Sequence, residues 1–126
     1  MSRGLLLFAH GARDPNWARP FEQVALRVAR QAPQLAVQLA YLEFMQPDLA
    51  NAGRRLADAG CSVVDVVPLF LGAGGHVRKD LPELLERLAL QFPQVRWSLR
   101  PAIGEAESVI DAMAQAALAS MEQSTP

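Results

Sequence analysis

Residues 63–82 read Val-Val-Asp-Val-Val-Pro-Leu-Phe-Leu-Gly-Ala-Gly-Gly-His-Val-Arg-Lys-Asp-Leu-Pro. The stretch begins as an apolar run rich in valine, which is typical of a strand covered on both faces in a parallel sheet. Glycines interrupt the run and lead to His76, and the pattern after His76 is helical. Ligands of open parallel sheets bind outside the carboxyl ends of the strands. We therefore expect His76 to lie at such an end.

The second histidine of the sequence, His10, also follows an apolar run, residues 4–9. The chain has only these two histidines, and each comes directly after or shortly after a strand of the buried type. The carboxyl ends of parallel strands meet at one edge of a sheet. This coincidence is the strongest functional indication in the sequence.

The length and composition predict one globular domain spanning residues 1–126. Hydrophobic residues make up 51% of the chain and charged residues 20%, which is typical of a folded protein rather than a disordered one. No apolar run approaches the roughly 18–20 residues that span a bilayer. The net charge is −1 with no basic cluster, so we expect neither nucleic acid nor a membrane as a partner. The single cysteine, Cys61, cannot form an internal disulfide, which favours the cytoplasm.

Strand and helix patterns alternate four times along the chain. The predicted strands are 4–9, 35–42, 62–67 and 95–100, and the predicted helices are 15–31, 48–59, 80–92 and 105–121. Such alternation predicts an α/β fold, a three-layer domain with a four-stranded parallel sheet flanked by helices. Strand 35–42 alternates more than the first strand, which indicates a place nearer the sheet edge.

Each of the four predicted helices has an apolar face that we expect to point toward the sheet. In the first helix this stripe includes Trp17 and Phe21. In the last helix it includes Val109, Ile110 and Met113, and continues to Ala117 and Met121.

Four side chains with useful chemistry fall in loops at the predicted carboxyl edge: His10, Arg13, Glu43 and His76. Two imidazoles and a carboxylate suit a borderline divalent metal such as cobalt, nickel, iron or zinc. An imidazole can also act as a general base near neutral pH. A carboxylate in a loop is often merely solvated, so the spacing alone leaves the role of Glu43 open.

The glycines before His76 do not form a nucleotide-binding motif. The segment lacks the third glycine of a dinucleotide fingerprint and the Gly-Lys-Ser/Thr ending of a P-loop. Gly74 and Gly75 are instead predicted to let the backbone approach a flat or bulky ligand, or to let the loop move. Arg13 and Arg78 flank the two histidine segments, either as solubilising surface residues or as partners for the carboxylates of an acidic ligand.

The chain resembles the class II tetrapyrrole chelatases, and in particular the short sirohydrochlorin cobaltochelatases of the CbiX family. The resemblance covers nearly the whole chain. It rests on residues 10–15 followed by Trp17 and Phe21, on Leu42-Glu43, and on the pattern of residues 67–82 with Gly74 and His76. It implies a domain equivalent to one half of a two-lobed chelatase.

The resemblance further implies an enzyme that inserts Co²⁺ into sirohydrochlorin for cobalamin synthesis, and relatives of this type insert Fe²⁺ or Ni²⁺. His10 and His76 would bind the metal and accept pyrrole protons, assisted by Glu43. Arg13 and Arg78, with Gly74 and Gly75, would contact the tetrapyrrole. The implied assembly is a homodimer, and the divalent metal is a substrate rather than a tightly bound cofactor.

Two other classes of function fit parts of the sequence. A non-catalytic carrier would bind a metal or a tetrapyrrole and pass it on without accelerating metallation. A response-regulator-like or partner-binding domain would need an acidic cluster after the first strand, where this sequence has His10.

Overall fold

The computed structural model describes residues 2–72 and 74–122, with the backbone but not the side chain of His76. The four strands are β1 (Ser2–Ala9), β2 (Ala36–Tyr41), β3 (Cys61–Pro68) and β4 (Arg96–Leu99). The helices are η1 (Pro15–Ala18), α1 (Arg19–Gln31), α2 (Leu49–Asp58), α3 (Gly75–Gln91), η2 (Ile103–Glu105) and α4 (Glu107–Glu122).

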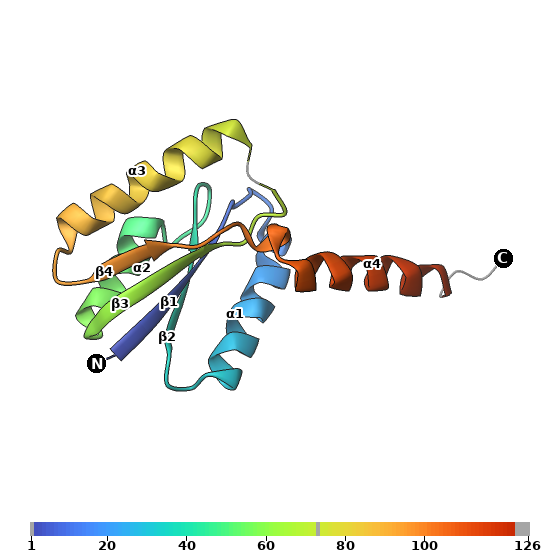
Figure 1. Cartoon of the computed structure of the whole chain (residues 1–126), viewed down its shortest axis with the longest axis horizontal. Coiled ribbons are helices and arrows are strands. Elements are labelled where there is room, and N and C mark those ends of the chain that lie inside the picture. The colour runs from blue at the N-terminus through green and yellow to red at the C-terminus, as the bar shows by residue number, and fades with distance from the viewer. Residues whose placement is uncertain (1, 73, 123–126) are drawn as a thin grey trace.

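All four strands are parallel and lie in the order β2-β1-β3-β4, so the two strands that precede the histidines are the central pair (Figure 1). The predicted parallel α/β sheet is confirmed, and β2 lies at an edge as expected. Mostly aliphatic side chains make the central strands suitable for this position, and the polar exceptions Arg3 of β1 and Asp65 of β3 pair with each other at 2.9 Å. The carboxyl ends of β1 and β3 are therefore neighbours.

The two faces of the sheet are covered unequally. One face packs against α2 and α3 through a core that includes Leu6, Phe8 and Val66 of the strands with Leu56 and Leu88 of the helices. The opposite face packs against α1 through a smaller cluster centred on Ala9, Ala18 and Tyr41. Helix α1 has no fully buried residue, because it covers only the β1 and β2 side of this face.

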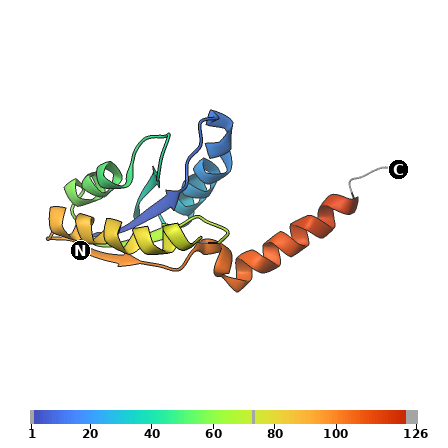
Figure 2. The same ribbon diagram turned by 90° about the horizontal axis from the view of Figure 1, so that it is seen from above.

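The expectation that α4 packs on the sheet is wrong. Helix α4 leaves the domain at the carboxyl edge and extends away from it, as both views show (Figures 1 and 2). It has no buried residue, and Ile110 and Met113 are 43% and 41% exposed. The segment before it is held against the end of β3, because the Gly104 N–H donates to the Phe70 carbonyl at 2.9 Å. The helix therefore begins beyond the edge of the sheet and points away from it.

The starts of two other helices also differ from the prediction. Helix α3 begins at Gly75 rather than near Asp80, so His76 lies in its first turn and not in a loop. Glycine is unfavourable inside a helix but tolerated at its start, which the sequence pattern alone does not reveal. The first predicted helix is divided into η1 and α1 by Pro20, which lacks the N–H needed to continue the first turn.

Candidate functional site

The loops after β1 and β2 bring His10 and Glu43 into direct contact. The Nε2 atom of His10 lies 3.1 Å from Oε1 of Glu43, and both side chains are about half exposed, at 50% and 49%. A carboxylate can only accept hydrogen bonds. In a neutral His10, Nε2 therefore carries the ring proton and donates a hydrogen bond to Glu43. Nδ1 is then the ring nitrogen with a free lone pair.

The backbone around this pair is fixed by contacts between the two loops. The Leu42 N–H donates to Ala9 and the Glu43 N–H donates to His10, at 2.9 and 3.1 Å, so the β1–β2 ladder continues into the loops. Gly11 has φ +92°, and a Cβ at this position would overlap the carbonyl oxygen of Glu43. Only glycine permits both the left-handed backbone and this close approach. Gly11 therefore allows the loop after β1 to lie directly against the loop after β2.

A pocket of about 430 Å³ opens beside His10. Its wall is mostly apolar and includes Trp17, Phe21, Phe70 and Gly74. The ring centres of Trp17 and Phe21 lie 4.5 Å apart. The His10 ring meets the Phe70 ring edge-on, with 6.2 Å between their centres. Trp17 and Phe21 thus reach the sheet face as predicted and also line the pocket, which the helical periodicity did not indicate. Such a wall suits a flat, conjugated ligand.

The glycines before His76 are not required by the internal packing of the chain. Gly74 precedes the first turn of α3 with φ −67°, and added Cβ atoms at Gly72, Gly74 or Gly75 would meet nothing within 4 Å. Side chains at these positions would therefore meet open space rather than the described part of the chain. The side chain of His76 lies outside the described residues, so its predicted role stays a prediction.

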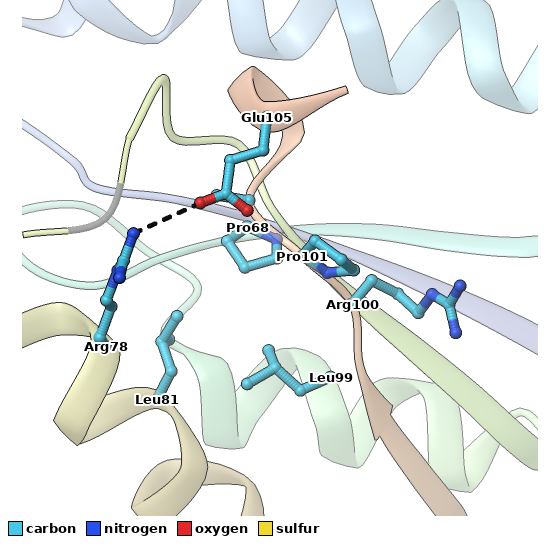
Figure 3. A pocket seen from close by; sticks show the side chains of 8 residues that line it. Pro68, Arg78, Leu81, Leu99, Arg100, Pro101 and Glu105 are labelled. Carbon is cyan, nitrogen blue, oxygen red and sulfur yellow. Dashed lines mark ion pairs between the residues drawn. The ribbon is translucent and has the colours of Figure 1, made fainter. Parts of the chain in front are cut away.

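Of the two predicted arginines, one has an acidic partner and the other an aromatic one. Arg78 on α3 points toward Glu105 of η2, with Nη2 3.6 Å from Oε1, at a second pocket of about 320 Å³ (Figure 3). Arg100, on the same pocket, points away from Arg78. The guanidinium carbon of Arg13 lies 5.0 Å from the centre of the Phe44 ring. Sequence reasoning missed Glu105 and Phe44.

No group of three or more histidine, cysteine, aspartate or glutamate side chains gathers within the described residues. The described residues also contain no helix with the length and apolar character needed to cross a membrane. Cys61 is buried at the start of β3 and is not bonded to another cysteine.

Comparisons with known proteins identify the family of this chain. The family model CbiX matches residues 4–119. A sirohydrochlorin cobaltochelatase of Sulfurisphaera tokodaii is 33% identical over 87 residues, which are 68% of this chain and 69% of the relative. A sirohydrochlorin cobaltochelatase of Methanosarcina barkeri is 30% identical over 82 residues, 65% of this chain and 63% of the relative. The chain thus matches only about two thirds of the length of these relatives.

Two solved structures show the same fold. The crystal structure of a CbiX protein from Marinobacter aquaeolei superposes with a TM-score of 0.86 at 33% identity, covering 97% of this chain and 99% of the other. SirB from Bacillus subtilis, solved with Fe³⁺, superposes with a TM-score of 0.75 at 27% identity. That match takes in 91% of this chain but only 46% of SirB, so one SirB chain is about twice as long.

Proposed function

The chain belongs to the CbiX family, and we propose that it is a metal chelatase that inserts Co²⁺ into sirohydrochlorin. The observation that carries the proposal is the His10–Glu43 pair at 3.1 Å, placed beside an apolar, aromatic pocket at the carboxyl edge of the sheet. Relatives named sirohydrochlorin cobaltochelatase support the choice of metal and tetrapyrrole.

The pair is suited to the chemistry of metallation. The reaction joins a divalent metal to the four ring nitrogens and releases two pyrrole protons, so it needs a base close to the macrocycle. Glu43 holds the Nε2–H of His10 and leaves the Nδ1 lone pair for the metal or for a pyrrole proton. A carboxylate partner also stabilises the imidazolium that forms when His10 accepts a proton.

The metal is a substrate that must be released into the macrocycle. We infer that His10 and His76 hold it on one face of the tetrapyrrole, with Glu43 assisting. An open set of two imidazoles, one of them oriented by Glu43, suits several borderline divalent ions and is weaker than a closed four-ligand site. We infer no tightly bound cofactor beyond this metal substrate. Arg13 and Arg78 would pair with carboxylates of the tetrapyrrole, and Gly74 and Gly75 would allow its close approach.

Anaerobic metallation of sirohydrochlorin, followed by absorbance, tests the proposal. The chain should accelerate insertion of Co²⁺ over the spontaneous rate, and parallel reactions with Fe²⁺ and Ni²⁺ rank the metals. His10→Ala and His76→Ala should each abolish the acceleration while the thermal unfolding midpoint stays within a few degrees. Leu90→Ala, at an exposed position on α3, serves as the control that retains the full rate.

Two results of these reactions would contradict the proposal. A wild-type chain that binds sirohydrochlorin but gives only the spontaneous rate with all three metals would replace the enzyme by a carrier. A His76→Ala variant with nearly full rate would remove that histidine from the site.

We further propose that residues 1–126 act as one domain of a homodimer in which the two copies exchange α4. Helix α4 carries an apolar stripe, including Ile110, Met113 and Leu118, that its own domain does not bury. The sheet face opposite α2 and α3 is covered by α1 at β1 and β2, and Val63 and Val67 of β3 remain only half-buried there. Because SirB is about twice as long, one SirB chain has room for two such units.

The charges of α4 and of the open sheet face support packing of α4 from one copy on the sheet of the other. Residues 107–122 contain Glu107, Asp111 and Glu122 and no lysine or arginine. The open face beside β3 carries exposed Arg96 and Arg100 near the half-buried valines, and its one acidic residue on β3, Asp65, is paired with Arg3. An acidic helix with an apolar stripe therefore complements a basic face with apolar positions. A helix of this length extends about 24 Å, so its apolar stripe is offered well beyond its own domain.

Analytical ultracentrifugation of the full chain tests the exchange. We expect a dimer for the wild type and a monomer for Ile110→Glu combined with Met113→Glu, because two charges would be buried in the interface. Leu90→Glu is the matched control and should stay dimeric, since Leu90 lies on α3 and is 82% exposed. A wild-type chain that stays monomeric at micromolar concentration contradicts the homodimer. The single, buried Cys61 favours a reducing compartment, and we place the protein in the cytoplasm.

A further inference from the structure

Phe44, which directly follows Glu43, has an unusual backbone for its side chain. Its φ is +67°, and it is the one non-glycine residue with positive φ in the described part of the chain. A left-handed backbone is costly for residues with a Cβ and is a marked outlier for a bulky aromatic. Such residues persist only where their surroundings hold them, and they cluster at functional sites.

The surroundings of Phe44 hold its backbone but do not cover its ring. The Glu43 N–H donates to His10 and the Met45 N–H donates to Glu43, at 3.1 and 2.9 Å, and Tyr41 is bonded to Pro47 at 2.9 Å. The Phe44 side chain is nevertheless 58% exposed. The fold thus maintains an unfavourable backbone at a position where the aromatic ring contributes little to the core.

The ring contacts a side chain from the loop of His10. The Arg13 guanidinium lies over the Phe44 ring at 5.0 Å, within the range of a cation–π contact. Arg13 is exposed and has no carboxylate partner among the described side chains. Two loops that present the His10–Glu43 pair thus also present an aromatic face and an unpaired cation.

We propose that Phe44 and Arg13 together form a contact platform for the tetrapyrrole, which rests on the function proposed above. The Phe44 ring packs against the flat macrocycle, and the cation–π contact holds Arg13 where it pairs with a carboxylate on the edge of that macrocycle. Phe44 is thus a specificity-determining residue, because it favours ligands that are both flat and acidic. Its place next to Glu43 fixes the macrocycle relative to His10.

Replacing Phe44 separates a binding role from a structural one. Glycine adopts positive φ without cost, and asparagine adopts it more readily than phenylalanine does. In Phe44→Gly and Phe44→Asn, the urea midpoint should therefore stay equal or rise. The Kd for metal-free sirohydrochlorin, measured by fluorescence titration, should instead increase about tenfold in both variants. Phe44→Tyr should stay within about twofold of the wild type, since the ring is retained.

The link between the two residues is tested by combining them. Arg13→Gln alone should weaken sirohydrochlorin binding, and the loss should be smaller in a Phe44→Gly background, because Arg13 is no longer held by the ring. An unchanged Kd in Phe44→Gly and Phe44→Asn would overturn the platform, as would strictly additive losses for the pair.

This experiment distinguishes the failure of the platform from the failure of the enzyme. A wild-type chain that binds sirohydrochlorin without metallating it would overturn the chelatase, while the Kd values of the Phe44 variants would still decide the platform. A chain that metallates at full rate with an unchanged Kd in these variants would overturn the platform alone. No binding of sirohydrochlorin to the wild type would overturn both.

Discussion

The two histidine segments at the carboxyl edge are held in opposite ways. The segment with His10 is fixed, because Gly11 lies against the Glu43 carbonyl and backbone hydrogen bonds tie the two loops together. The segment before His76 is open, because Gly72, Gly74 and Gly75 have unoccupied space where a side chain would be. Glycine is thus used on one side for close contact and on the other side for clearance.

This difference matches the two tasks of the proposed reaction. A base must be oriented closely to take protons from a ring nitrogen, which requires a fixed imidazole. A large flat substrate must also enter and leave, which requires room for backbone and ligand to approach each other. In the proposed reaction, the fixed side would orient the base and the open side would admit the substrate.

The largest expected effect is a difference in stability between an alanine substitution on the fixed side and one on the open side. Gly11→Ala places a Cβ on the Glu43 carbonyl oxygen and forces a left-handed alanine, so we expect a loss of about 3 kcal/mol in unfolding free energy. Gly74→Ala meets open space with an ordinary φ, so its stability should change by less than about 0.5 kcal/mol. Urea unfolding followed by circular dichroism measures both values.

The same pair of variants tests function. Gly74→Ala should weaken sirohydrochlorin binding despite its normal stability, because the new methyl group occupies space on the open side. Equal stability losses in the two variants would contradict the distinction between a fixed and an open side.

The next largest effect is expected for Glu43→Gln. The glutamine amide can donate or accept, so it no longer dictates which nitrogen of His10 carries the proton. We expect the metallation rate at saturating substrate to fall about 10- to 100-fold, as for other residues that orient an imidazole. Stability should hardly change, because both side chains are half exposed. Stopped-flow absorbance gives the rate, and an unchanged rate would show that His10 acts without Glu43.

Much of this arrangement could be predicted from the sequence. The valine-rich run and the alternation of strands with helices predicted the parallel sheet. Asp14 before Pro15 is likewise typical of a helix start, and its carboxylate accepts from the Asn16 N–H at 2.9 Å. His10 and Glu43 could be placed at one edge because parallel strands end together. These features depend on local patterns that carry their own physical cause.

The features that could not be predicted depend on contacts between distant segments. Periodicity shows that α4 has an apolar face, but not that Gly104 is held against the end of β3 and directs the helix away from its own domain. Nothing in the sequence marks Phe44 as left-handed, because phenylalanine avoids that conformation. The contact of Arg78 with Glu105 joins residues far apart in the chain and follows from the same turn at η2.

A smaller effect is expected where the open side meets α4. Glu105→Gln removes the partner of Arg78, whose ion pair is long at 3.6 Å and exposed. Such pairs contribute little to stability, so only ligand binding should respond. If Arg78 pairs with a substrate carboxylate, the Kd for sirohydrochlorin should fall about two- to threefold at low salt and less at high salt. Titration at two salt concentrations measures this, and weaker binding would mean that Glu105 positions Arg78 instead.

The smallest expected effect reports how firmly the fixed side is held. Burial at the end of β2 raises the pKa of Tyr41 above its ordinary value of 10.0, and the nearby carboxylate of Glu22 raises it further. The native state therefore keeps the phenol protonated to a higher pH than the unfolded state does. The resulting stabilisation of the fold is present below pH 10 and is lost as pH rises through the raised pKa. The unfolding free energy of the wild type should fall more steeply above pH 10 than that of Tyr41→Phe.

Because Tyr41 is the only tyrosine, ultraviolet absorbance of tyrosinate follows it alone. In Gly11→Ala the loops after β1 and β2 should separate and admit water to the phenol, so the pKa of Tyr41 should return toward its ordinary value of 10.0. Gly74→Ala should leave the titration of Tyr41 unchanged. The same titration in the wild type and both variants would mean that the contact of Gly11 with Glu43 does not keep water from the end of β2. The fixed side would then be limited to the loop itself.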